Sequence, residues 1–148
     1  MAWWLLAGAI PASMIALTLM YPTNRADTAP NHQNPRLRTR RYPLRGTINE
    51  VQRRIEAIIP ELTTYGAHWR LVHSHNHDTA GNRIIIRAEV PVFFFTDDLE
   101  VRLEPTENNQ EVRVDIQSAA RLGKSDLGEN QRHVLTLLAA LDKQLGNR

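Results

Sequence analysis

The chain has 148 residues, of which 42% are hydrophobic and 23% charged, and its formal net charge at pH 7 is +2. This length fits one globular domain, and so small a net charge gives no electrostatic reason to expect a nucleic-acid-binding protein. The chain has no cysteine, which excludes disulfide frameworks, thiolate metal sites and cysteine nucleophiles.

Residues 3–21 form an uncharged run of 19 residues. As a helix, this run is roughly 28 Å long, close to the hydrocarbon thickness of a bilayer. Trp3, Trp4 and Tyr21 lie at its two ends, where aromatic rings favour the headgroup level. We therefore expect residues 1–21 to be a single transmembrane anchor. The alternatives are a core helix and a cleaved signal peptide, but a signal peptide normally has basic residues before its apolar run.

Residues 22–35 contain three prolines and lack apolar periodicity, which is typical of an extended linker before a globular domain at 36–148. The domain begins with an arginine-rich stretch. By the positive-inside rule, these basic residues place the domain in the cytoplasm. The stretch can contact anionic lipid headgroups or form a solvated strand edge, whereas nucleic acid is not favoured because no aromatic residues are interleaved. The arginines are Arg36, Arg38, Arg40 and Arg41.

The domain is expected to open with a strand at 39–45 and a helix at 48–62. Thr47 and Glu50 have the spacing of a capping box, and apolar residues at helical spacing follow. Pro60 falls in the last turn of this amphipathic helix and helps to end it.

Four further strands are expected in the middle of the chain. Apolar and polar residues alternate at 69–74, 99–104 and 112–117, and a β-branched and aromatic run occupies 83–95. Residues 96–98 (Thr-Asp-Asp) are interpreted as a tight turn. The strict period of two predicts an antiparallel sheet with one wet face and one buried face.

The last element is expected to be a helix that begins at Ser125 or Asp126 and runs to about Leu145, just before Gly146. Leu127 and the later leucines share its apolar face. The predicted fold is therefore α+β, with an N-terminal transmembrane helix followed by one domain. In that domain, two helices pack on a twisted antiparallel sheet of about five strands.

Two segments of the sequence, FTDDLE at 95–100 and SAARLGKSDLGEN at 118–130, carry a family resemblance. Over roughly residues 36–145, the chain resembles a family of bacterial and plastid proteins known as domain of unknown function 1499. The resemblance implies frequent membrane anchoring and no known activity, cofactor or substrate. Gln117 and Ala120 stand where arginine and serine are common in the family, which disfavours an enzyme.

Two small groups of side chains are candidates for cation binding. Asp97 and Asp98 can bind a hard cation or act as an acid–base pair, although adjacent carboxylates more often shape a turn. His73, His75 and His77 would share one face of a strand at a spacing that suits zinc or copper. A solvated turn is the alternative for these histidines.

A polar cluster is predicted at the start of the last helix, formed by Arg121, Lys124, Ser125, Asp126 and Asn130. Exposed N–H groups at a helix start can receive an anion, and Arg121 and Lys124 would lie beside it. The structural alternative is helix capping by Ser125 and Asp126 with an internal Arg121–Asp126 ion pair.

No histidine or cysteine lies near enough in sequence to this cluster to suggest a nucleophile and its base, so we expect neither catalysis nor a cofactor. The leading hypothesis is an accessory or assembly subunit of an integral-membrane complex, for example photosynthetic or respiratory, with lipid and other membrane subunits as partners. One alternative is a module for a small ligand, either anionic or an apolar one held by the phenylalanines of 93–95 between the sheet and the last helix. The other is an enzyme of unknown reaction that uses Asp97, Asp98 and Arg121.

Overall fold

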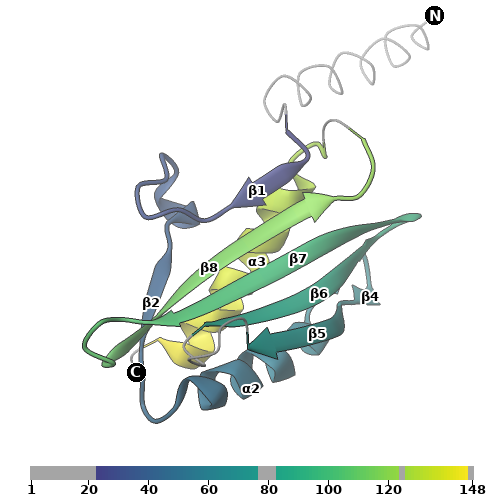
Figure 1. Ribbon diagram of the computed structural model, residues 1–148. Helices are drawn as coiled ribbons and strands as arrows, with labels where there is room; N and C mark the ends of the chain where they lie inside the picture. Colours follow the sequence, from purple (N-terminus) through teal and green to yellow (C-terminus); the bar gives the residue numbers. More distant parts are fainter. Residues whose placement is uncertain (1–22, 77–82, 124–125, 147–148) are drawn as a thin grey trace, which may run out of the picture.

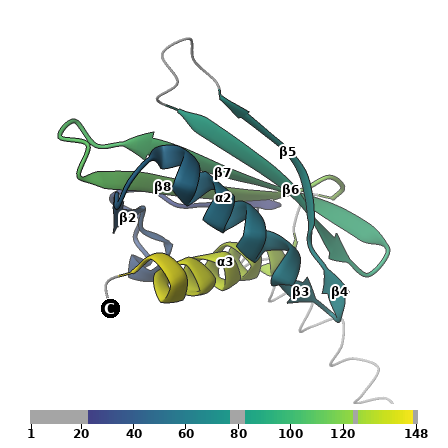
Figure 2. The same cartoon turned by 90° about the horizontal axis from the view of Figure 1, so that it is seen from below.

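The computed structural model describes residues 23–76, 83–123 and 126–146. The expected α+β class is confirmed, with two helices against one face of an antiparallel sheet (Figures 1 and 2). The sheet has six strands rather than five, in the order β1-β8-β7-β6-β5, with β2 also pairing with β8. Its strands are β1 (Arg25–Asp27), β2 (Arg40–Pro43), β5 (Arg70–Asn76), β6 (Ile84–Val92), β7 (Phe95–Pro105) and β8 (Glu111–Ala120). A separate hairpin joins β3 (Thr63–Thr64) to β4 (Ala67–His68).

The first long helix forms where the capping box predicts it. Helix α2 covers Ile48–Ile58, and the Glu50 carboxylate accepts the N–H of Thr47 at 3.3 Å. The α-helix ends earlier than expected, because Pro60 lies in a following 3-10 turn, Ile59–Glu61. A second 3-10 turn, Pro35–Leu37, precedes β2.

Helix α3 (Glu129–Leu145) begins three or four residues later than the predicted start at Ser125 or Asp126. Gly128 before it has a left-handed backbone with φ of 88°, and Leu127 has φ of 54°. The chain therefore turns before the helix starts. As a result, Leu127 is 36% exposed instead of lying on the apolar face of the helix.

The turn between β6 and β7 lies at Phe93–Phe94, so the prediction of a turn at residues 96–98 was wrong. Val92 pairs with Phe95, which leaves a loop of two residues. Asp97 and Asp98 lie inside β7 and pair with both β6 and β8. Strand pairing on both sides satisfies the backbone here, and it outweighs the local turn preference of the two aspartates.

Alternation along the long strands separates a buried face from an open one. In β7, Leu99, Val101 and Leu103 are buried against the helices, whereas Glu100 and Arg102 point to the open side. Trp69 is 2% exposed and closes one side of the core. The other core residues on the sheet and helices include Ile55, Ile59, Ile84, Ile86, Val112, Val114, Ile116, Val134, Leu137, Leu138 and Leu141.

Strand β1 lies within the segment that was expected to be an extended linker. It pairs with β8, with Arg25 opposite Ala119. The Thr28 N–H then donates to the Ile116 carbonyl at 2.8 Å. A strand of three residues is too short for its apolar periodicity to be recognised, which explains why the sequence analysis missed it.

The anchor expected over residues 1–21 lies outside the described residues. Within the described ranges, the structure contains no helix that is both long enough and apolar enough to cross a membrane.

Candidate functional site

Arg121 lies at the end of β8 on the open side of the sheet. Its guanidinium donates to Asp98 through Nε at 3.0 Å and Nη2 at 2.6 Å, and Nη2 also reaches Glu89 at 2.5 Å. The prediction of an Arg121–Asp126 ion pair is therefore wrong, because Arg121 pairs with Asp98 and Glu89 instead. Strand register decides the partner of Arg121, since Asp98 lies opposite Ala119 on the neighbouring strand.

Asp126 has the capping role that the sequence predicts. One carboxylate oxygen accepts the Gly128 N–H at 3.0 Å and the other accepts the Asn130 N–H at 2.6 Å. Two N–H groups that an anion would need at this helix start are thus already bound to a carboxylate. Lys124 and Ser125, the remaining members of the predicted cluster, lie outside the described residues.

Asp97 and Asp98 do not form a joint site, because neighbouring residues of a strand point to opposite faces. Asp98 points to the open face and pairs with Arg121. Asp97 is only 4% exposed and points to the helix side, where its Oδ2 lies 3.5 Å from Nδ1 of His133. The hypothesis that the two aspartates act together as one acid–base pair or one cation site is therefore wrong.

A buried polar cluster occupies the junction of β7, β8 and α3. Ser118, Asn130 and His133 are each at most 2% exposed. The Ser118 hydroxyl donates to Asn130 Oδ1 at 2.5 Å and lies 3.4 Å from His133 Nδ1. His133 was not predicted as part of a site, although a histidine on the inward face of an amphipathic helix is a signal that could have revealed it.

The geometry of this cluster does not suit nucleophilic catalysis. Ser118 and Asp97 both face Nδ1 of His133. In a catalytic triad, the hydroxyl and the carboxylate lie on opposite ring nitrogens, so that the ring can take a proton from one while the other orients it. Ser118 is also completely buried and donates its proton to Asn130. The cluster is arranged to join the helix to the sheet.

Burial shifts the ionisation of both titratable groups in this cluster. Burial, together with the charges of nearby carboxylates, raises the pKa of Asp97 to about 6. Burial lowers the pKa of His133 to about 4. The imidazole is therefore neutral near pH 7. His133 Nε2 and Glu129 Oε2 lie 3.7 Å apart, and within the described part of the chain neither atom has a hydrogen-bond partner.

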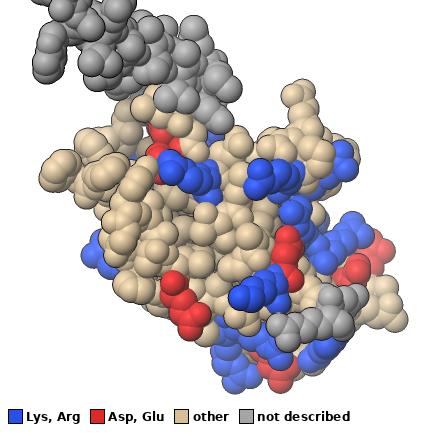
Figure 3. All heavy atoms as spheres, turned by 180° about the vertical axis from the view of Figure 1, so that it is seen from behind, with Lys and Arg blue, Asp and Glu red and all other residues tan. Residues whose placement is uncertain are grey.

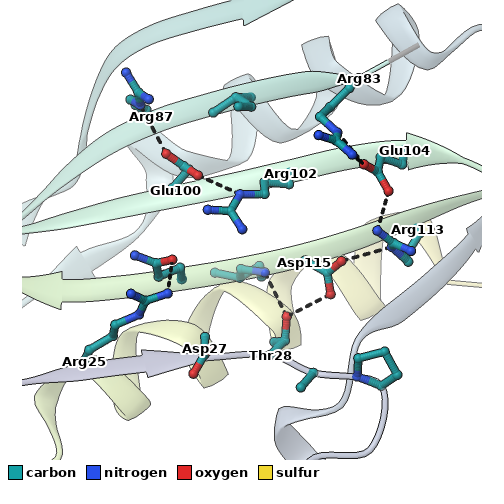
Figure 4. A pocket seen from close by; sticks show the side chains of 15 residues that line it. Arg25, Asp27, Thr28, Arg83, Arg87, Glu100, Arg102, Glu104, Arg113 and Asp115 are labelled. Atoms are coloured by element: carbon teal, nitrogen blue, oxygen red, sulfur yellow. Dashed lines mark hydrogen bonds and ion pairs between the residues drawn. The ribbon is translucent and has the colours of Figure 1, made fainter. Parts of the chain in front are cut away.

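The open face of the sheet carries a charged hollow of about 630 Å³ (Figure 4). Glu100 accepts from Arg87 at 3.2 Å and from Arg102 at 2.7 Å. Glu104 likewise lies between two arginines, Arg83 and Arg113. We call this hollow the charged groove, and its charged lining residues are Arg25, Asp27, Arg83, Arg87, Glu100, Arg102, Glu104, Arg113 and Asp115.

The charged groove combines five arginines with four carboxylates, so its net charge is close to neutral. Arg25 donates to the Gln117 amide oxygen at 2.6 Å, and Asp115 accepts from Thr28 and Thr39. A second hollow of about 320 Å³ adjoins it near Arg121. Such mixed charge suits a polar protein surface better than the phosphate backbone of a nucleic acid. The groove could not be predicted from the sequence, because strand register alone brings these residues together.

The arginine-rich stretch lies at the other end of β8 from β1. Arg41 in β2 pairs with Arg113, near the start of β8, whereas Arg25 in β1 pairs with Ala119, near its end. Arg40 pairs with Asp142 near the C-terminal end of α3 at 3.3 Å, and it donates to the Arg38 carbonyl at 2.7 Å. The stretch is thus folded against the domain.

The predicted histidine site lies at the limit of what the structure describes. His73 and His75 belong to β5, but their side chains, and the whole of His77, lie outside the described part. Among the side chains that are described, no three His, Cys, Asp or Glu residues are grouped to hold a metal ion.

The three phenylalanines expected to line an internal cavity lie on the surface. Phe93, Phe94 and Phe95 are 73%, 98% and 56% exposed. Phe93 and Phe94 form the turn beyond the end of the core, and Phe95 begins β7. The hypothesis that they hold an apolar ligand between the sheet and α3 is therefore wrong.

The sequence profile of a family described as "Protein of unknown function (DUF1499)" matches residues 18–141. A comparison with curated proteins gives no match. Among solved structures, the chain is similar to the Ran-binding protein Mog1p of Saccharomyces cerevisiae, with 11% identity and a TM-score of 0.41 over 84% of this chain and 80% of that one. A Mog1 mutant shows 10% identity and the same TM-score over 81% and 77% of the two chains.

Proposed function

Since the chain belongs to the DUF1499 family, whose function is unknown, we propose a function from its geometry. The protein is a membrane-anchored, non-enzymatic accessory subunit whose open sheet face binds a neighbouring membrane protein. The observation that carries this proposal is the charged groove. Both helices pack on the other face of the sheet, so the groove is left open to a partner (Figures 2 and 4).

The ion pairs in the charged groove support a protein partner. Arg87, Arg102 and Arg113 are all more than 40% exposed in their side chains, although each contacts a carboxylate. Exposed ion pairs stabilise a fold by only about 0–1 kcal/mol, so these arginines can exchange partners at little cost. Arginine is also enriched in protein–protein interfaces, because its planar group pairs with carboxylates in a fixed geometry.

The anchoring part of the proposal rests on the uncharged run at 3–21, which ends two residues before Thr23. The non-enzymatic part rests on the buried cluster. There, the hydroxyl of Ser118 and the ring of His133 have an arrangement that ties α3 to β8.

A capture experiment from native membranes tests this function. The full chain carries Arg87→Glu together with Arg102→Glu, which reverses two exposed charges in the charged groove. The matched control is Arg53→Glu together with Arg54→Glu, which makes the same charge change on exposed positions of α2. We expect the wild type and the control to retain the same membrane proteins and the groove variant to lose them.

Two results would contradict the proposal. One is recovery of the wild-type chain from mild detergent as a lone monomer without co-purifying membrane subunits. The other is equal loss of partners in both variants, which would show that overall charge and not the charged groove controls the association.

A further inference from the structure

One end of the domain carries large apolar side chains that the fold leaves in contact with water. Phe93 and Phe94 form the β6–β7 turn, and Phe95 begins β7. Leu122, which is 69% exposed, follows the end of β8. Asp97 pairs with Ala120, the last residue of β8, so Phe95, two residues before Asp97, and Leu122, two residues after Ala120, both lie beyond the last β7–β8 pair at this end of the sheet. We call Phe93, Phe94, Phe95 and Leu122 the aromatic end.

Folding alone does not account for phenylalanine in this turn. Phe93 has φ of 50°, a left-handed backbone that favours glycine or asparagine and that costs a bulky residue conformational energy. Its ring stacks on Tyr65 with centroids 4.1 Å apart, but Tyr65 is itself 50% exposed. Phe94 is 98% exposed and buries almost nothing. A cluster of this kind on a small domain indicates contact with an external apolar surface.

The N-terminal segment joins the domain at this same end. The Ala120 N–H donates to the Asn24 carbonyl at 2.8 Å, and the Asn24 amide donates to the Gly123 carbonyl at 2.8 Å. Asn24 is therefore fixed beside the loop that holds Leu122. The uncharged run at 3–21 ends three residues before Asn24. Figure 1 shows that the start of β1, the end of β8 and the β6–β7 turn all lie towards the right of the sheet, whereas β2 lies at the lower left.

Charged side chains are few at the outermost part of the aromatic end and are gathered at the opposite end of the domain (Figure 3). Figure 3 shows the helix side of the molecule, with the end that bears the β6–β7 turn at the left, where the outermost atoms are mostly uncharged. By contrast, Arg40 and Arg41 lie with β2 near Asp142 at the far end. Entry of uncharged side chains into a bilayer fits the aromatic end, whereas the arginine-rich end could contact only charged headgroups at its surface.

We propose that the aromatic end inserts into the interfacial layer of the bilayer that holds the N-terminal segment. This inference rests on the membrane anchoring in the proposed function and adds a second point of contact. Aromatic rings favour the headgroup boundary, the layer in which interfacial amphipathic helices bury their apolar face by about 5–10 Å. Because β6, β7 and β8 run away from the aromatic end, insertion stands the sheet upright on the membrane. The charged groove then faces sideways, towards neighbouring membrane proteins.

Fluorescence quenching on the full chain in lipid vesicles tests the insertion. The chain contains no cysteine, so one introduced thiol gives one labelled site. An environment-sensitive dye is attached to Phe94→Cys, to Leu122→Cys, which keeps all three phenylalanines, or to Asn108→Cys as the control. Asn108 is exposed in the β7–β8 turn at the opposite end of the sheet. Vesicles of phosphatidylcholine and phosphatidylglycerol carry nitroxide-labelled lipid, and iodide is the aqueous quencher.

We expect the nitroxide lipid to quench the dyes at positions 94 and 122 several-fold more than the dye at 108, and iodide to show the reverse order. If the chain floats with the vesicles but iodide quenches all three dyes equally, the insertion is wrong and the anchoring stands. Failure to float overturns both. Protection from iodide without quenching by lipid would assign the aromatic end to a second copy or another protein, which also overturns the insertion.

Discussion

Asp97 and His133 contribute to the free energy of unfolding with opposite dependences on pH over one pH range. Burial raises the pKa of Asp97 from 3.8 to about 6, so the stability that it contributes is present below pH 3.8 and is lost as pH rises through 6. Burial lowers the pKa of His133 from 6.5 to about 4, so its contribution is present above pH 6.5 and is lost as pH falls through 4. Each shift corresponds to about 3 kcal/mol, and the two effects nearly cancel between pH 4 and 6.

The variant Asp97→Asn should expose the effect of His133 alone. Its free energy of unfolding should fall by about 3 kcal/mol more than that of the wild type between pH 6.5 and pH 4, because protonation of the buried imidazole is no longer offset. Urea unfolding at several pH values measures this. Asp98→Asn, next in sequence but on the open face, is the control. Parallel pH profiles for the wild type and Asp97→Asn would refute the opposed titration.

Asn130 connects three parts of the buried cluster and should therefore be important for stability. Its amide oxygen accepts from Ser118, and its amide nitrogen donates to the Asn24 carbonyl at 2.8 Å. Asn130→Ala leaves buried partners unsatisfied, so we expect a loss of about 2–3 kcal/mol in the free energy of unfolding. Gln144→Ala, an exposed position on the same helix, should change it by less than about 0.5 kcal/mol. Equal effects in thermal unfolding would show that Asn130 has no special role.

The sequence could predict residue roles that depend on near neighbours. Asp126 caps the turn before α3 because its partners, Gly128 and Asn130, lie two and four residues away. The partner of Arg121 could not be predicted, since Asp98 is 23 residues away in sequence and meets it only through the register of β7 and β8. The same holds for Ser118 and His133, which different elements bring together.

At the scale of elements, the regular segments were predictable and the irregular ones were not. β7 and β8 alternate strictly, so their existence and inward faces follow from the period of two, although β7 begins four residues and β8 one residue earlier than the alternation predicted. The β6–β7 turn was misplaced because Phe93 and Phe94 have none of the residue types that normally mark a turn. β1 was missed because three residues carry no period, although their hydrogen bonds to β8 make them part of the sheet.

The contribution of β1 can be measured with two shortened chains, one beginning at Thr23 and one at Asn34. The shorter chain loses the β1 ladder and the two hydrogen bonds between Thr28 and Ile116, at 2.8 and 2.9 Å. At about 0.5–1.5 kcal/mol for each net hydrogen bond, we expect a loss of about 3 kcal/mol. The melting temperature should fall by about 10 °C. Two chains with the same melting temperature would mean that this segment is a linker, as the prolines suggest.

At the scale of the whole molecule, the proposed contacts use different forces at different places. The charged groove faces sideways from the sheet and consists of ion pairs that water can reach. The aromatic end consists of apolar side chains such as Phe94 and Leu122. Neither surface can be seen in the composition of the chain, because the near-neutral net charge hides a row of arginines and acids that only the folded sheet aligns.

This separation predicts opposite responses to salt. Raising the ionic strength from 0.1 to 1 M shortens the screening length from about 10 Å to 3 Å, which weakens exposed charge–charge contacts. Capture of membrane partners through the charged groove should therefore fall. Lipid quenching of the dye at position 94 should stay the same, because burial of apolar surface is not screened. Both are measured on one reconstituted sample at the two salt concentrations. If quenching and partner capture fall together, the aromatic end and the charged groove belong to one electrostatic interface, and the upright arrangement on the membrane is wrong.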